Sequence, residues 1–101
     1  MSKNTQPAPM EELELPYTYK FRKPFRFGTE THPEVVLEHE LTGGDILDAM
    51  NEKREGDRVL RLLSALTGWP DPKVKAIPAR DFIALGELVG RFLPSGLPTG
   101  N

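Results

Sequence analysis

The longest run of apolar residues at helical spacing lies in the segment Asp57–Trp69. The apolar side chains that would share one stripe of this helix are Val59, Leu60, Leu62, Leu63 and Leu66. Asp57 is placed to cap the amino end, and Gly68 to adopt the left-handed conformation after the last turn. Ordering each backbone residue costs roughly 1–2 kcal/mol, whereas burying each large apolar side chain contributes roughly 1.5–3 kcal/mol. Because these terms nearly cancel, we expect the helix to need packing partners.

Before this helix, apolar residues recur at every second position, as in a half-buried strand. The aromatic side chains that would share one face are Tyr17, Tyr19, Phe21, Phe25 and Phe27. The segment Gly28–Thr31 can turn the chain. After Pro33 a second alternating run would place on one face Val35, Leu37, His39 and Leu41. The pattern predicts a β-hairpin, and because a two-stranded hairpin is marginally stable alone, we expect its aromatic face to pack on helices.

The outer face of this hairpin is predicted to be charged. Basic side chains on the first strand would oppose acidic ones on the second, and these are Lys20, Arg22, Arg26, Glu34, Glu38 and Glu40. Each well-placed cross-strand pair contributes roughly 0.2–1 kcal/mol, which supports the register without deciding the fold. Pro24 cannot donate a ladder hydrogen bond, so the first strand should lie at an edge or bend there.

A short helix is predicted directly after the hairpin. Thr42, followed three residues later by Asp45, is a variant of the capping box, and the helix should run to about Arg54. The side chains of its inner face would be Ile46, Leu47, Ala49 and Met50.

Two more helical segments are predicted after the central helix. Asp71 can cap a single turn that has Pro72 at its first helical position and ends at Ala76. The last helix should run from about Ala79 to Leu93. Its apolar stripe would consist of Phe82, Leu85, Val89, Phe92 and Leu93.

Together these elements predict an α+β fold in which an N-terminal β-hairpin packs on a small bundle of three to four short helices. We expect one domain over residues 15–93. Residues 1–14 are predicted to form a disordered arm, because they contain little that can be buried, and residues 94–101 a flexible tail.

The composition narrows the classes of partner and chemistry. The chain has 101 residues, of which 38% are hydrophobic and 28% charged, as is typical of a soluble globular domain. Because cysteine is absent, a disulfide framework and thiolate metal ligands are excluded. The net charge of -2 gives no general attraction to nucleic acid, and no segment resembles a membrane span. We therefore expect neither nucleic acid nor membrane as a partner.

Residues that commonly perform catalysis or bind metals occur singly. His32 and His39 are the only histidines. On a continuous strand they would face opposite sides of the sheet, so they could not coordinate the same metal ion. The three serines, Ser2, Ser64 and Ser95, are expected in the disordered arm, on the polar side of the central helix and in the tail, so none resembles an activated nucleophile. We expect no catalytic residue, no cofactor and no metal, and a protein that is not an enzyme.

Partner contacts are expected on the two longest helices and the tryptophan that follows the first of them. The candidate partner-binding residues are Leu60, Leu63, Trp69, Phe82, Gly86 and Gly90. Gly86 and Gly90 lie one turn apart on the last helix, where each costs about 1 kcal/mol relative to alanine. Such a cost suggests that another backbone comes close, either inside the domain or from a partner, and both alternatives remain open.

Several short motifs occur in a characteristic order. They are Lys23-Pro24, Gly28, the Thr-Gly-Gly-Asp of Thr42–Asp45, the Leu-Thr-Gly of Leu66–Gly68, and Asp81-Phe82. Over about residues 17–93 this order resembles the tail assembly chaperones of Mu-like and P2-like tailed phages. The chain departs from the family's pattern at His39-Glu40-Leu41, where an arginine and a proline near the helix cap are usual.

The resemblance implies a small non-enzymatic α+β protein of a phage or prophage. Such a protein binds the tape measure protein and keeps it soluble until the tail tube polymerises around it. The tail tube protein is a further candidate partner, and an open strand edge would also allow self-association. The resemblance implies a location in the bacterial host cytoplasm and absence from the mature virion. The alternative is a structural tail or baseplate component that stays in the virion.

Overall fold

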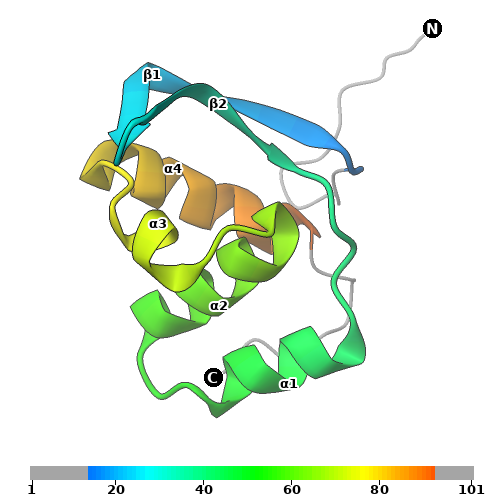
Figure 1. Cartoon of the computed structure of the whole chain (residues 1–101). Coiled ribbons are helices and arrows are strands. Elements are labelled where there is room, and N and C mark those ends of the chain that lie inside the picture. Colours follow the sequence, from blue (N-terminus) through cyan, green and yellow to red (C-terminus); the bar gives the residue numbers. More distant parts are fainter. Residues whose placement is uncertain (1–13, 93–101) are drawn as a thin grey trace, which may run out of the picture.

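A two-stranded antiparallel sheet followed by four α-helices makes up the computed structural model, which describes residues 14–92 (Figure 1). The elements in chain order are β1 (Tyr17–Phe27), β2 (Glu30–Leu37), α1 (Gly43–Asn51), α2 (Glu55–Thr67), α3 (Asp71–Lys75), α4 (Ala79–Val89) and the 3-10 helix η1 (Gly90–Phe92). This order confirms the predicted α+β fold. The predicted arm 1–14, apart from Glu14, and the predicted tail 94–101 lie outside the described residues, as does Leu93, the predicted end of the last helix.

Two residues, Gly28 and Thr29, connect β1 to β2. Gly28 has a φ of 63°, a left-handed value that glycine adopts without strain and that a two-residue hairpin turn needs at its first position. The turn is shorter than the predicted segment Gly28–Thr31, because Glu30 already pairs with Phe27.

The ladder between the strands is irregular where each strand contains a proline. The residue pairs on either side of the irregularity are Lys20–Glu34 and Phe25–His32. Between them, the segment Phe21–Pro24 of β1 lies opposite Pro33 alone. A proline has no N–H group to donate to a ladder, and the interruption includes Pro24, where β1 was predicted to lie at an edge or to bend. The irregularity also changes the alternation, so His32 lies opposite Phe25 on the aromatic side of the hairpin.

β2 ends earlier than predicted, at Leu37, so His39 and Leu41 do not continue its inner face. The chain leaves the sheet because the N–H groups of Glu38 and His39 both donate to the carbonyl of Leu66, at 2.9 and 3.1 Å. This carbonyl lies in the last turn of α2, where it has no partner within the helix. The chain after β2 is therefore tied to the end of α2.

The predicted charge pairs on the outer face are only partly present. Lys20 lies opposite Glu34 as expected, whereas Arg26 faces Thr31 and Arg22 lies within the irregular segment. The glutamates that follow the end of β2 are Glu38 and Glu40. The shifted register and the shorter second strand explain the difference.

The Leu-Thr-Gly motif forms the carboxyl end of α2. Gly68 has a φ of 76°, and its N–H donates to the carbonyl of Ser64 at 2.9 Å, which confirms its predicted left-handed conformation. The Thr67 hydroxyl donates to the carbonyl of Leu63 at 2.7 Å and accepts the N–H of Trp69 at 3.1 Å. The motif therefore pairs the Ser64 carbonyl, one of the last four of the helix, and the N–H of Trp69.

α1 begins as the sequence predicts. The Thr42 hydroxyl accepts the N–H of Asp45 at 3.1 Å, and the Asp45 carboxylate accepts the N–H of Thr42 at 2.9 Å, so both bonds of the capping box form. The helix ends at Asn51 and not near Arg54, because Glu52 already has extended backbone angles.

Two other helices begin earlier than predicted. α2 begins at Glu55 after Arg54, so Asp57 lies in its first turn and is not the cap. α3 begins at Asp71 after Pro70, so Asp71 is its first residue and not its cap. In these positions both carboxylates still offset the positive end of a helix dipole.

α1 lies against α2 on the side away from the hairpin (Figure 1). Ala49 is buried and Ile46 is partly buried against the core. Leu47 and Met50, which were predicted to face inward, are 62% and 50% exposed. Because α2 is the main neighbour of α1 among the described residues, only one side of α1 is covered.

The core joins the hairpin to α2, α3 and α4. Its fully buried apolar side chains are Leu37, Leu63, Leu66, Val74 and Leu85. Phe21 and Phe25 are also buried, which confirms that the aromatic face of the hairpin packs on the helices.

One buried carboxylate, Asp81, connects α4 to β1. Its side chain is 2% exposed and accepts the Tyr19 hydroxyl at 2.7 Å and the Arg22 N–H at 3.3 Å. Asp81 also lies in the first turn of α4, where the helix dipole favours a negative charge. Burial and the bond to this carboxylate raise the pKa of Tyr19 to about 12. Asp81 thus holds the strand at the point where its ladder is interrupted.

We expect Asp81→Ala to lower the free energy of unfolding by about 2 kcal/mol, because it leaves the Tyr19 hydroxyl and the Arg22 N–H without their acceptor. Urea denaturation followed by circular dichroism measures the change. Glu87→Ala, at an exposed position of the same helix, is the control and should change stability by less than about 0.5 kcal/mol. Equal losses in the two variants would contradict the role of Asp81.

Stability should also depend on the ionisation of Tyr19. Since folding raises its pKa from 10.0 to about 12, its contribution is fully present below pH 10 and is lost as the pH rises through 12. We expect the stability difference between the wild type and Tyr19→Phe to hold up to about pH 10 and to shrink between pH 10 and 12. Urea denaturation at a series of pH values measures it, and a constant difference over this interval would be the opposing result.

Candidate partner-binding site

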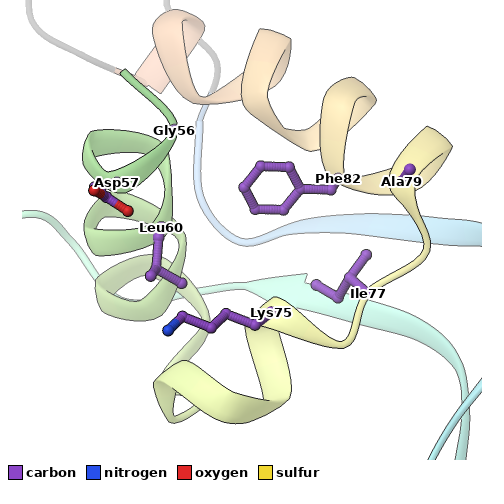
Figure 2. Close-up of a pocket in the computed structure, with 7 residues that line it drawn as sticks. All are labelled: Gly56, Asp57, Leu60, Lys75, Ile77, Ala79 and Phe82. Atoms are coloured by element: carbon purple, nitrogen blue, oxygen red, sulfur yellow. The ribbon is translucent and has the colours of Figure 1, made fainter. Parts of the chain in front are cut away.

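A hollow of about 400 Å³ opens between the beginning of α2, the end of α3 and the beginning of α4 (Figure 2). We call it the α2–α4 hollow. Its lining residues are Gly56, Asp57, Leu60, Lys75, Ile77, Ala79 and Phe82. It brings together two of the predicted partner-binding residues, Leu60 and Phe82.

Small residues at the beginnings of two helices leave this space open. Gly56 lies in the first turn of α2, and a Cβ atom there would have no neighbour within 4 Å. Ala79 is the first residue of α4 and is exposed. Leu60, Ile77 and Phe82 are directed into the space between the helices (Figure 2). The floor of the hollow is therefore apolar, and the hollow is open beside Gly56 and Ala79.

Two charged residues complete the lining of the α2–α4 hollow. Asp57 comes from α2 and Lys75 from α3, and no hydrogen bond or ion pair joins either side chain to another described residue. The lining contains no serine, cysteine or histidine that could act as a nucleophile or base. An apolar floor with one charge of each sign suits the apolar face of another polypeptide, as when an amphipathic helix enters a groove.

A second hollow, of about 520 Å³, lies between β1 and the end of α4. Its lining residues are Tyr17, Tyr19, Ala84, Glu87, Leu88, Gly90 and Arg91. A Cβ atom on Gly90 would have no neighbour within 4 Å among the described residues, and one on Gly86 would meet the side chain of Val59 at 3.5 Å. No backbone therefore lies against either glycine within this part of the chain, and contact with a partner remains a prediction.

Trp69, a third predicted contact, lies in a cluster of aromatic rings from the hairpin. Its ring centroid is 5.9 Å from that of Phe25 and 5.0 Å from that of His32. The ammonium group of Lys73 lies 4.2 Å from the centroid of the Trp69 ring, a cation–π contact. The Trp69 ring thus makes contacts with both the hairpin and α3.

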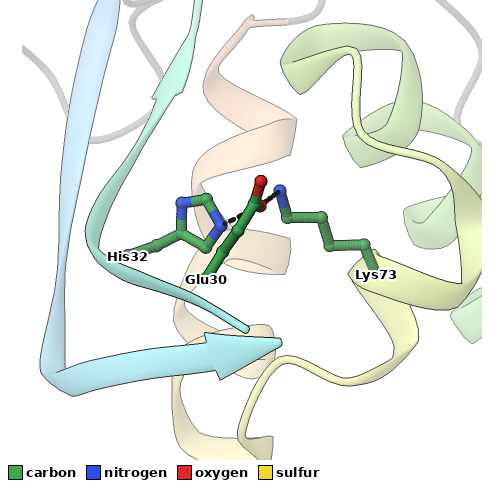
Figure 3. Close-up of polar contacts among 3 residues, drawn as sticks. All are labelled: Glu30, His32 and Lys73. Atoms are coloured by element: carbon green, nitrogen blue, oxygen red, sulfur yellow. Dashed lines mark hydrogen bonds and ion pairs between the residues drawn. The ribbon is translucent and has the colours of Figure 1, made fainter. Parts of the chain in front are cut away.

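An exposed carboxylate completes this join (Figure 3). Glu30 accepts a hydrogen bond from the Lys73 ammonium at 3.4 Å and lies 3.2 Å from Nε2 of His32. The bonds from Lys73 first and from His32 second lower the pKa of Glu30. The trio connects β2 to α3 at the surface.

The six predicted contact residues are therefore spread over several places. Leu60 and Phe82 share the α2–α4 hollow, Gly90 lines the second hollow, and Trp69 lies under the hairpin. Leu63 is fully buried in the core, and Gly86 lies beside the Val59 side chain of α2. The structure gathers no single surface from the whole set, and their role in binding a partner remains a prediction.

Sequence reasoning missed two polar residues, His32 and Asp81, that connect the hairpin to the rest of the domain. His32 was assigned to the opposite side from the aromatic residues, because the alternation assumed a continuous strand. The prolines Pro24 and Pro33 were the available signal for the irregularity. Asp81 lies four residues before Leu85, on the buried side of α4, and this helical spacing could have shown that it is buried.

No three histidine, cysteine, aspartate or glutamate side chains in residues 14–92 are grouped closely enough to hold a metal ion. None of the helices described is both long and apolar enough to cross a bilayer.

Comparison with known proteins identifies the family. The family model described as "Phage tail assembly chaperone proteins, E, or 41 or 14" matches residues 18–94. No curated protein and no solved structure is significantly similar to the chain. The match begins at the second residue of β1 and extends past η1, so it includes all the helices and nearly the whole hairpin. The chain therefore belongs to the family of phage tail assembly chaperone proteins.

Proposed function

We propose that this chaperone binds the tape measure protein of its phage and keeps it soluble until the tail tube polymerises. The observation that supports the proposal is the apolar α2–α4 hollow in a member of this family. A tape measure protein is long and helical, so before assembly its apolar faces are open to water. The hollow can cover such side chains with Leu60, Ile77 and Phe82.

Binding of this kind requires no chemical step. The complex forms by burial of apolar surface, and each apolar side chain removed from water contributes roughly 1.5–3 kcal/mol. Release follows when tube subunits cover the same surface of the client, since two proteins cannot occupy it together. The chaperone then acts as a non-enzymatic protein in the host cytoplasm and is absent from the finished virion.

Co-expression with the tape measure protein of the same phage tests the proposal. We expect this chaperone to move the client from the insoluble to the soluble fraction and to co-purify with it, because the complex covers apolar surface that otherwise aggregates. The control is the client expressed alone at the same level. If the client is equally soluble in both cultures, the proposed function is wrong.

Mass spectrometry of purified virions separates this function from its alternative. A chaperone should be absent from the particles, whereas a structural tail or baseplate component must be present in stoichiometric amount. Stoichiometric detection would therefore reject release before maturation.

Filling the α2–α4 hollow tests its role in binding. We expect Ala79→Arg to leave the thermal unfolding midpoint nearly unchanged, because position 79 is exposed, but to prevent the client from being held in the soluble fraction. Ala76→Arg is the matched control, since Ala76 is also exposed and lies outside the lining. Equal client solubility with the two variants would show that the hollow is not the contact.

A further inference from the structure

The outward side of α1 carries apolar side chains that nothing in the described part of the chain covers. Leu47 is 62% exposed and Met50 is 50% exposed, one turn apart on the same helix. Large side chains with this exposure lower the solubility of a free protein, and adjacent ones commonly mark a contact surface.

Two glycines extend this face over the first turn of α1. Gly43 lies four residues before Leu47, so helical spacing puts both on one face, with Gly44 beside them. A Cβ atom on Gly43 would meet nothing within 4 Å, and one on Gly44 only the Thr42 hydroxyl at 3.6 Å. Neither glycine has a positive φ, so neither the backbone nor the packing of the described residues requires it. Because the glycines have no side chains, the backbone of another polypeptide can approach this part of α1 closely.

The charge on α1 itself is negative. Asp48 is exposed and makes no hydrogen bond or ion pair with another described residue. Asp45 is the other charged residue of α1, and its carboxylate is occupied by the capping box. The helix contains no lysine or arginine. Arg58, on the neighbouring helix, is directed to the backbone carbonyls of the residues that follow α1.

We propose that this face, which we call the α1 face and define as Gly43, Gly44, Leu47, Met50 and the flanking Asp48, docks an amphipathic helix whose apolar stripe is bordered by lysine or arginine. The inference rests on the proposed function, because it names a second surface for the same helical client. A client helix laid over the two glycines buries Leu47 and Met50 and places its basic border beside Asp48.

A second copy of the chain fits the α1 face less well. A two-fold contact would set the same acidic helix against itself and bring like charges together. α1 also has only nine residues, so the surface that it offers is far below the roughly 800 Å² per partner of a stable dimer. A small contact with a basic helix, used together with the α2–α4 hollow, also suits a client that must be released.

Nuclear magnetic resonance of the ¹⁵N-labelled full chain tests the α1 face directly. The probe is a designed amphipathic peptide of about 20 residues, long enough to form a helix, with leucine on one face and lysine on its borders. We expect the amide signals of residues 43–51 to shift on titration, and an isomeric peptide with glutamate borders to bind at least about fivefold more weakly. If the signals of residues 43–51 do not move, the proposal is wrong.

Variants separate specific docking from general attraction between opposite charges. Asp48→Lys should weaken binding of the lysine-bordered peptide about fivefold. Glu34→Lys makes the same change of net charge on the hairpin's outer face and should leave the affinity unchanged. The double variant Leu47→Asn, Met50→Gln should lose the shifts at residues 43–51. Equal weakening by Asp48→Lys and Glu34→Lys, or retained shifts in the double variant, would overturn the proposal.

The same double variant distinguishes failure of this inference from failure of the proposed function. In co-expression, we expect the wild type to keep the tape measure protein soluble and the double variant to retain less of it. If both keep it equally soluble, the α1 face does not bind this client, while the proposed function stands. If the wild type itself gives no effect, the proposed function and the client assigned to the α1 face are both wrong.

Discussion

A two-stranded sheet cannot hold its shape alone, and in this protein each strand is fixed to a helix by hydrogen bonds at a point where the ladder stops. The N–H groups after β2 bond to the Leu66 carbonyl at the end of α2. The buried carboxylate of Asp81 accepts the Arg22 N–H where the ladder of β1 is interrupted. With both strands fixed, the aromatic face of the hairpin stays on the core.

Local signals in the sequence predicted the parts of the fold that depend on a few neighbouring residues. The capping box of Thr42 and Asp45, the left-handed Gly68 and the aromatic face of β1 all involve contacts or conformations that short patterns specify. The change of register opposite Pro33 and the early end of β2 were not predicted. The first requires knowing how the two strands are aligned, and the second depends on a bond to Leu66, far away in the sequence.

The candidate site, like the fold, could be predicted only where local patterns decide. Helical spacing identified Leu60 and Phe82 as apolar positions, and the structure places both in one hollow. The same spacing could not tell whether a neighbour covers an apolar residue. Leu63 is therefore found in the core, whereas Leu47 and Met50, assigned to an inner face, are exposed. An apolar pattern shows that a side chain should be buried, and only tertiary structure shows whether this chain or another polypeptide buries it.

The close approach of His39 to Gly68 limits how the sequence of this protein can vary. A Cβ atom at position 68 would lie 2.9 Å from Nε2 of His39, and the backbone there has the left-handed φ that other residues avoid. Any side chain at position 68 would displace the imidazole of His39, a residue whose backbone N–H donates to the Leu66 carbonyl. Among relatives, position 68 should accordingly stay glycine, since the left-handed φ would strain any other residue even where the exposed His39 side chain moved aside.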